Sequence, residues 1–437
     1  MALAERLKRL IAGHNDRVLL WTAVAVGAVA HLAALILFGK IGPKANIWEY
    51  GVQAQCALRT GGDLCQYYFS GPQGSYPSAY MPPFLSYMWL MLFKLFGDTA
   101  VARIVWLAIN WAISLINIGL LFQLGRRWKL SPVACFLAAV TLALYPTFVF
   151  VVATYHQTEW TVMFLLLLAL LGTQVLQSPE SPLKAVVWMG VVSGFATLNR
   201  SEMIIIGPAM IVLVCALRRQ VVPVVAAAVA MILVLAPWTV RNYQLFHRVV
   251  PVAQSAGYNL WKGFNPYTNG SGNMTEMPGG PGDRKLSEIR DRIPHGAMYE
   301  PALQDAYKEQ FKHDLAAAGP VRLAQLVVTK TALLWGFDWT DREITARPLY
   351  RLPWLAANVL ALYGLVLVVQ RRGLAREGVI VGGALLVLLT AAYAATAVHT
   401  RYRMHIEPLL FLLTGVGVEA LVLMVLRVQR DPSPQTA

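Results

Sequence analysis

Charged residues are scarce in this sequence. Only 14% of its 437 residues are Asp, Glu, Lys or Arg, whereas an average soluble domain has about 25%. Hydrophobic residues make up 57%, and the mean hydropathy is +0.52. A soluble core could not bury this much apolar surface, which excludes an ordinary soluble enzyme or binding module. We expect an all-α protein that crosses a membrane many times.

A long run of basic residues is also missing, although the formal net charge is +14. The Lys and Arg residues are scattered through short loops between apolar runs, which is the positive-inside pattern of membrane proteins. A nucleic-acid partner is therefore not expected, whereas membrane lipids are. The apolar runs are poor in charge and show no internal repeat. The sequence thus lacks the usual signs of an ion pathway or of a transporter built from two related halves.

Cysteine is scarce too, with four residues in the chain. Cys56 and Cys65 share a segment that we place outside the membrane, where the sequence allows a disulfide but does not require one. Cys135 and Cys215 lie in apolar runs and are predicted to be packing residues.

The apolar runs predict about ten transmembrane helices. They lie near residues 18–38, 101–123, 131–153, 160–177, 184–199, 203–217, 221–237, 353–370, 377–398 and 405–427. The run 84–96 would extend only roughly 20 Å as a helix, too short for a hydrocarbon core of about 30 Å. We therefore place it in the outer interface, together with 323–337, which carries Lys330 at its centre. With this choice every basic cluster that follows a span is cytoplasmic.

This topology divides the chain into five segments. They are a cytoplasmic amphipathic N-terminus at 1–17, a transmembrane core at 18–237, an external segment at 238–352, C-terminal spans at 353–427 and a cytoplasmic tail at 428–437. A first external loop, 39–100, lies within the core. The cytoplasmic loops are too short to form a domain, so we expect any chemistry on the outer side.

Few acidic or imidazole side chains outside the membrane are suited to chemistry. Glu49, which precedes Tyr50, and Asp63 lie in the first external loop, where a carboxylate can act as a general base or hold a metal. A solvated charge on a short interfacial helix explains Glu49 equally well. His156 and Glu159 lie in the next outer turn. A carboxylate at a helix start is also favoured by the helix dipole, so Glu159 has a purely structural explanation.

Three arginines are expected at the outer face, where the positive-inside bias disfavours them. Arg241 follows one span, and Arg401 and Arg403 precede another. The guanidinium fork binds phosphate oxygens in pairs, which suits a phosphate ligand. Nonspecific binding of lipid headgroups is the alternative. Arg200, in a short outer turn, is a further candidate.

A series of short motifs runs along nearly the whole chain. In chain order they are W-x-Y-G-x-x-A-x-x-x-L-x-x-G at 48–61, Y-x-P-P with an apolar helix ending in F-G at 80–97, the acidic turn at Glu159, G-x-x-x-L-N-R at 194–200, P-W-x-x-R-N at 237–242, G-Y-N-L-W-x-G-F-N-P at 257–266 and R-Y-R-x-x-x-x-P at 401–408. Their order resembles that of bacterial glycosyltransferases of the GT-C fold. The similarity is to the glycosyltransferase 39-like group, which is related to protein O-mannosyltransferases and to the lipid A aminoarabinose transferase.

The resemblance implies a reaction and a location. A sugar would pass, with inversion, from a polyprenyl phosphate to a hydroxyl of a lipid, glycan or protein at the periplasmic side of a bacterial inner membrane. Glu49 would be the base and Asp63 the second choice. Arginines or a divalent metal would hold the departing phosphate. The implied phosphate ligands are Arg241, Arg401, Arg403 and Arg200, and the implied substrate or metal ligands are His156, Glu159, Tyr50 and Asn259.

One departure from the family pattern keeps other functions open. Relatives often carry an Asp-Glu pair four and three residues before the loop tyrosine, where this chain has Asn46 and Ile47. A noncatalytic accessory subunit of the same fold is therefore one alternative. A transporter or flippase for a lipid-linked substrate is another, although it predicts charged or broken helices at mid-membrane.

Overall fold

The computed structural model describes residues 15–66, 76–178, 182–338, 340, 347–371 and 373–428. Most of the predicted N-terminal segment, residues 1–17, and of the tail 428–437 lies outside these residues. Within them the regular structure is helical, apart from two isolated bridges, Cys65 with Pro77 and Ser271 with Val398. The predicted all-α polytopic class is confirmed.

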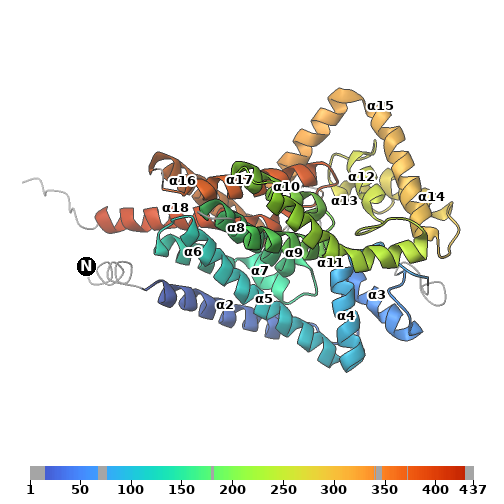
Figure 1. Ribbon diagram of the computed structural model, residues 1–437, viewed down its shortest axis with the longest axis horizontal. Coiled ribbons are helices and arrows are strands. Elements are labelled where there is room, and N and C mark those ends of the chain that lie inside the picture. The colour runs from blue at the N-terminus through green and yellow to red at the C-terminus, as the bar shows by residue number, and fades with distance from the viewer. Residues whose placement is uncertain are drawn as a thin grey trace, which may run out of the picture.

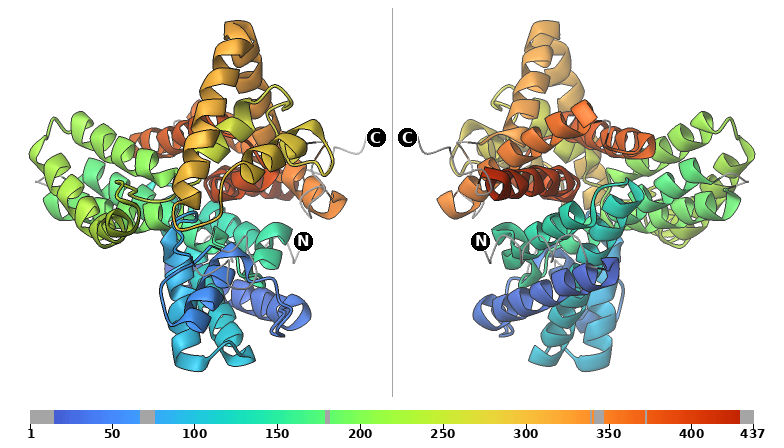
Figure 2. Two further views of the ribbon diagram at one scale, coloured as in Figure 1. Left: turned by 90° about the vertical axis from the view of Figure 1, so that its right-hand side faces the viewer. Right: turned by 90° about the vertical axis from the view of Figure 1, so that its left-hand side faces the viewer.

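The helices of the predicted spans form a bundle whose axes follow the length of the molecule (Figure 1). They are α2 (Asp16–Phe38), α5 (Ala100–Arg127), α6 (Pro132–Leu144), α7 (Pro146–Val152), α8 (Thr158–Gln177), α9 (Leu183–Asn199), α10 (Met203–Leu217), α11 (Val222–Phe246), α16 (Pro348–Arg371), α17 (Arg376–Ala394) and α18 (Glu407–Val428). Seen end-on, α2 and α5 lie on one side of the molecule and α9 to α11 on another (Figure 2), with α8 packed between α5 and α9 and α18 packed between α6 and α16.

Each of the ten predicted spans corresponds to helix, but their lengths differ. Seven helices in the described residues are long and apolar enough to cross a membrane. The pair α6 and α7, bent by 55° where Pro146 interrupts the run, makes an eighth if it is one span. The remaining two, α9 and α10, have 17 and 15 residues, and Pro208 lies inside α10. Both are shorter than the roughly 20 residues of a typical transmembrane helix.

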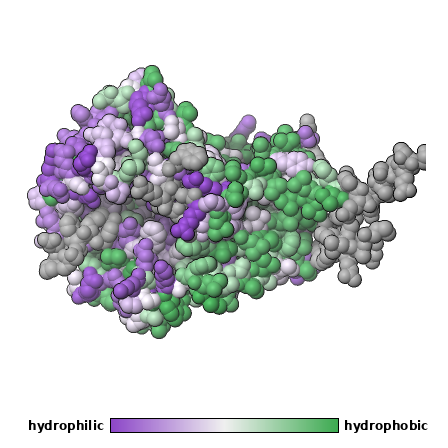
Figure 3. Space-filling model, turned by 180° about the vertical axis from the view of Figure 1, so that it is seen from behind, coloured by the Kyte–Doolittle hydropathy of each residue, from purple (hydrophilic) through white to green (hydrophobic). Residues whose placement is uncertain are grey.

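The remaining helices gather at one end of the bundle, opposite the ends of α2 and α18 that lead to the chain termini (Figure 1). They are α3 (Trp48–Thr60), α4 (Pro83–Phe96), α12 (Ala256–Phe264), α13 (Gly272–Thr275), α14 (Pro281–Asp291), α15 (Tyr299–Trp335) and the 3₁₀ helix η3 (Thr400–His405). Hydrophilic residues also gather at this end, whereas hydrophobic residues cover the bundle (Figure 3). This is the polarity expected of a membrane core with one large extramembrane end.

The two runs that we placed in the interface differ from the spans. Helix α4 begins at the Pro82-Pro83 pair and lies across the bundle direction (Figure 1), with Trp89 stacked on Trp106 at 4.5 Å. The run 323–337 falls largely in the second limb of α15, after a bend at Gly319, whose φ of +70° favours glycine. Lys330 is buried there, 3.2 Å from the Phe264 ring centroid. Their depth in a membrane stays a prediction.

The first external loop is closed by a disulfide between Cys56 and Cys65, the pair that the sequence left open. The bond joins the last turn of α3 to the segment after it. Backbone hydrogen bonds pair that segment with the strand-like stretch before α4, because Ser78 N–H donates to Leu64 O at 2.9 Å. The end of α3 and the stretch that leads to the Pro82-Pro83 corner are thereby held in one unit.

The arrangement predicts which ends of the helices face the same compartment. Lys184 lies in the first turn of α9, and Arg292 lies just beyond α14 at the opposite end of the molecule. We expect Lys184→Cys to react with a membrane-impermeant maleimide only from the cytoplasmic side, and Arg292→Cys only from outside. The native free cysteines, Cys135 and Cys215, are buried and provide a low background. Labelling of both new cysteines from one side would contradict the arrangement.

Candidate active site

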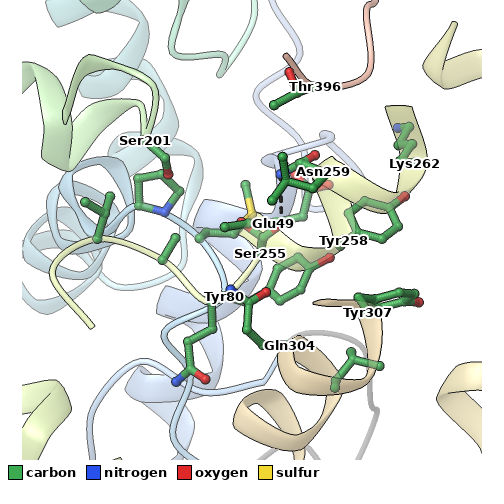
Figure 4. A pocket seen from close by; sticks show the side chains of 18 of the residues that line it. Glu49, Tyr80, Ser201, Ser255, Tyr258, Asn259, Lys262, Gln304, Tyr307 and Thr396 are labelled. Carbon is green, nitrogen blue, oxygen red and sulfur yellow. Dashed lines mark hydrogen bonds between the residues drawn. The ribbon is translucent and has the colours of Figure 1, made fainter. Parts of the chain in front are cut away.

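A cavity of about 1260 Å³ lies between the extramembrane helices and the adjacent ends of the bundle (Figure 4). Its walls come from the start of α3, the corner before α4, the turn between α9 and α10, α12, α14, the first limb of α15 and η3. Its charged lining residues are Glu49, Arg200, Glu202, Arg248, Lys262, Glu276, Arg290, Asp291, Asp305, Lys308 and Arg401. Of the ten residues predicted from the sequence, six line this cavity: Glu49, Tyr50, His156, Arg200, Asn259 and Arg401.

Glu49 is in the first turn of α3, partly exposed, at the cavity wall. No hydrogen bond or ion pair joins its carboxylate to another residue that the structure describes. The preceding Trp48 has a φ of +55°, in the left-handed region that non-glycine residues rarely adopt. Such strain is kept only where the surroundings enforce it, and it is common near functional sites. Glu49 is thus a carboxylate available to a ligand.

The two positions where relatives often carry acidic residues have structural roles here. The Asn46 Oδ1 accepts a hydrogen bond from Trp48 N–H at 3.0 Å, which holds the turn into α3. Ile47 is buried beneath that turn and packs in a cluster with Tyr50 and Trp89. Glu49, two residues further on, is the carboxylate that this turn presents to the cavity.

The outer turn before α8 closes one side of the cavity. Tyr50 is buried and shares a hydrogen bond of 2.9 Å with the Gln157 amide. His156 bonds Thr158 through Nδ1 at 2.7 Å and meets the Trp48 ring edge-on at 4.9 Å. Burial, with the nearby arginines, lowers the pKa of the His156 imidazole to about 3. A neutral imidazole supplies no positive charge for a phosphate, but it can exchange hydrogen bonds with a ligand.

Arg200 and Arg401 come from distant regions of the chain and line the same cavity. Arg200 forms an ion pair with Glu202 and lies 3.3 Å from His405 Nε2. Its guanidinium carbon is 5.1 Å from the Tyr402 ring centroid, and that of Arg401 is 5.8 Å from the same ring. An aromatic ring thus lies within cation-π distance of both guanidinium groups.

Two further predicted residues, Arg241 and Asp63, bind one another outside the cavity. Arg241 Nε donates to Asp63 Oδ2 at 2.6 Å, and its Nη1 donates to Ser78 O at 2.8 Å. Tyr87 O–H also donates to Asp63, at 3.0 Å. This ion pair ties the end of α11 to the first external loop. The geometry therefore gives both residues a structural role and does not bring them to the lining.

Arg403 and Glu159 are also away from the cavity. Arg403 is buried, donates to Glu407 at 3.2 Å and to Gly336 O at 2.6 Å, and lies over the Trp354 ring. Glu159 is buried where α8 packs on α5, and Asn117 Nδ2 donates to its carboxylate at 2.8 Å. Arg401 and Arg403 are two positions apart, so their side chains leave the backbone in different directions. The sequence alone does not show which of the two faces the ligand.

The cavity does not provide an evident metal site. No group of three or more His, Cys, Asp or Glu side chains suited to a metal ion occurs within the described regions of the chain. Glu49 lines the cavity, whereas Glu159, one of the metal ligands implied by the resemblance, is buried between α8 and α5. These residues do not fit a shared divalent ion, and no step below depends on one.

Some lining residues were not identified from the sequence. Lys262 lies at the variable position of the G-Y-N-L-W-x-G-F-N-P motif and is 5% exposed. Its ammonium contacts Glu276 at 2.5 Å. Glu202 lies two residues after Arg200, and Tyr402 separates the two arginines of the R-Y-R motif. A lysine inside an otherwise apolar and aromatic motif is the signal from which Lys262 could have been identified as a lining residue.

The corner before α4 is held by a buried carboxylate from α15. Glu300 is fully buried and accepts hydrogen bonds from Ser78 Oγ at 2.6 Å and from Ala79 N–H at 2.7 Å. The next residues, Tyr80 to Pro82, line the cavity. Burial raises the pKa of the Glu300 carboxyl to about 7, although these hydrogen bonds favour its ionised form.

Glu300 should make folding stability depend on pH. Because its pKa is higher in the folded state than the ordinary 4.5, its contribution is fully present below about pH 4.5 and is lost as pH rises through about 7. We expect the unfolding temperature to fall less between pH 5 and pH 8 in Glu300→Gln than in the wild type. Thermal unfolding in detergent measures this. The matched control Glu309→Gln, an exposed residue of α15, should keep the wild-type pH dependence, and an unchanged dependence in Glu300→Gln would refute the assignment.

Comparison with known proteins supports the fold. Residues 80–240 match the family model described as dolichyl-phosphate-mannose-protein mannosyltransferase. The oligosaccharyltransferase AglB of Archaeoglobus fulgidus, in complex with an inhibitory peptide and a dolichol-phosphate, has a TM-score of 0.55 at 14% identity, over 95% of this chain and 52% of that one. Its complex with Zn and sulfate has a TM-score of 0.53 at 14% identity, over 92% and 49%. The chain thus spans about half the length of AglB.

A weaker likeness is to ArnT of Cupriavidus metallidurans bound to undecaprenyl phosphate, with a TM-score of 0.41 at 14% identity, over 95% of this chain and 81% of that one. This value is too low to support an argument. No curated protein sequence matches the chain. The likeness to AglB confirms the predicted GT-C fold, and residues 80–240 are similar to the protein mannosyltransferase family model.

Proposed function

From this GT-C fold and its relation to the protein O-mannosyltransferases, we propose that the chain is a membrane glycosyltransferase. It transfers a sugar from a polyprenyl phosphate to an acceptor hydroxyl. The observation that carries the proposal is the composition of the cavity. Glu49, a carboxylate with no ion-pair partner among the described residues, shares it with Arg200 and Arg401.

The proposed reaction assigns a role to each of these groups. The acceptor oxygen attacks the anomeric carbon from the side opposite the phosphate, while Glu49 takes its proton. A bond forms between the acceptor oxygen and the sugar, and the bond from the sugar to the phosphate oxygen breaks. The electron pair leaves with the polyprenyl phosphate, whose charge Arg200 and Arg401 stabilise. The anomeric carbon is inverted because attack and departure occur on opposite faces.

The same cavity suits a substrate that is partly lipid. Ile204 and Ile205 line it at the start of α10, and Ile205 is 65% exposed. A polyprenyl chain can remain in the bilayer at this apolar edge while its phosphate reaches the arginines. The Cys56–Cys65 disulfide favours an oxidising compartment for the first external loop. We therefore propose a bacterial inner membrane with the cavity facing the periplasm.

Removing the base should abolish transfer. We expect Glu49→Gln to lower the rate at least 100-fold while leaving the unfolding temperature unchanged, because glutamine keeps the shape but cannot take the proton. Release of polyprenyl phosphate from a panel of lipid-linked sugars in nanodiscs measures the rate. Asp63→Asn should lower the unfolding temperature by breaking the Arg241 ion pair, with a smaller effect on rate.

This comparison also tests the alternatives. A wild-type rate in Glu49→Gln would rule out this base. Absence of transfer by the wild type with every donor would instead favour the noncatalytic accessory subunit, for which Asn46 and Ile47 are the supporting observation.

The arginines should respond differently to replacement by lysine. Arg401→Lys keeps the charge but loses the fork, so we expect affinity for farnesyl phosphate to fall roughly tenfold. Arg241→Lys should leave that affinity unchanged and lower the unfolding temperature, because Arg241 binds Asp63 and Ser78 rather than the cavity. Calorimetric titration of farnesyl phosphate gives both values. Equal affinities in Arg401→Lys and wild type would place the phosphate elsewhere.

A further inference from the structure

Lys262 lies at the cavity wall on α12 (Figure 4). A series of hydrogen-bonded side chains outside the cavity lining holds its ammonium from behind. Its Nζ is 2.9 Å from His399 Nε2, and His399 Nδ1 is 3.0 Å from Asn273 Oδ1. The Asn273 amide nitrogen donates in turn to Asp338 Oδ2 at 3.2 Å. Lys262, His399 and Asp338 are each no more than 5% exposed.

The hydrogen bonds of this series all run in one direction. An ammonium group can only donate, so His399 Nε2 must accept from Lys262. His399 Nδ1 then carries the proton and donates to Asn273, which donates to Asp338. Burial and the Lys262 charge lower the pKa of His399 well below its ordinary value, so the ring is neutral, as this arrangement requires. This series of hydrogen bonds ends at the Asp338 carboxylate. The carboxylate polarises each bond toward itself and fixes the position of the Lys262 ammonium.

Two glycines permit this close packing. A Cβ atom at Gly272 would lie 2.3 Å from His399 Nε2 and 2.7 Å from Lys262 Cε. A Cβ atom at Gly263 would lie 2.5 Å from the Thr396 carbonyl oxygen, where α12 meets the loop before η3. Real Cβ atoms do not approach this closely, so a larger residue would displace His399 or Lys262 at position 272 and the Thr396 backbone at position 263. The site is built around the position of the Lys262 ammonium.

The same ammonium also contacts Glu276, a residue of the cavity lining. The Glu276 carboxylate is 2.5 Å from Lys262 Nζ, is 38% exposed and also accepts from Tyr258 O–H. A cation buried this deeply requires a compensating anion, which Glu276 supplies. Glu276 is at the lining, so a ligand anion that enters the cavity can share Lys262 with it.

We propose that Lys262 is a third cation of the donor site and binds a phosphate oxygen of the lipid-linked donor. The inference rests on the proposed function and adds a residue to it. A neutral sugar is recognised adequately by amides and hydroxyl groups, and burying a fixed ammonium for it would be costly. A phosphate has several charged oxygens, and it can be shared between a guanidinium fork on Arg200 or Arg401 and the point charge of Lys262.

The test compares binding of farnesyl phosphate with binding of farnesol to the full-length protein in nanodiscs. We expect Lys262→Met to weaken farnesyl phosphate binding roughly 10- to 100-fold and to leave farnesol binding unchanged. Lys312→Met, a control at an exposed lysine of α15 outside the cavity lining, should bind both ligands as the wild type does.

A variant of opposite sign distinguishes a ligand role from a structural one. Glu276→Gln removes the competing carboxylate and should strengthen farnesyl phosphate binding several-fold, and this holds whether or not Lys262→Met folds. Asn273→Leu breaks the series but keeps the charge, so it should weaken binding less than Lys262→Met does. Unchanged phosphate binding in Lys262→Met, or weakened binding in Glu276→Gln, would overturn the inference while Arg401→Lys still reports on the proposed function. If the wild type does not bind farnesyl phosphate, the proposed function itself fails.

Discussion

The structure depends on pairing the charges that it takes out of water. A buried ion is costly unless an opposite charge and further hydrogen bonds compensate it. Around the extramembrane end of the bundle, four cations meet this requirement with a carboxylate from a neighbouring or distant segment. The pairs are Arg200 with Glu202, Arg241 with Asp63, Lys262 with Glu276 and Arg403 with Glu407. These pairs fix the ends of helices and the loops that form the cavity. Glu49 lies among them with no such partner in the described residues, and this makes it the side chain best placed to react.

The sequence was sufficient for the helices and for the side on which the polar residues gather. Apolar runs report burial in lipid directly, and the double proline before α4 starts that helix whatever packs around it. The breaks between the predicted runs also fall at turns in the structure, because polar and aromatic residues interrupt the runs there. Helix length was harder to judge. The bend at Pro146 and the shortness of α9 and α10 depend on how neighbouring helices pack, which the hydropathy of one segment does not contain.

The site was only partly predictable, for a similar reason. Arg401 and Arg403 flank the same tyrosine, yet one lines the cavity and the other is buried against Glu407 and Trp354. A difference of two residues in a 3₁₀ turn decides this, and the outcome depends on which neighbour supplies a carboxylate. Lys262 was missed because its partners, Glu276 and His399, are 14 and 137 positions away in the chain. Pairings over such distances follow from the tertiary fold.

The cavity also requires the external segment and the membrane core to act together. The core supplies Glu49 and Arg200, whereas the external segment supplies Lys262 and Asn259. Glu300, at the start of α15, binds the first external loop immediately before the residues that line the wall. Without this cover the arginines would face water, where an ion pair with phosphate is several times weaker than in a site that excludes solvent. The fold therefore strengthens electrostatic binding mainly by covering the charged end of the helix bundle with the polar external segment. The charges themselves contribute less.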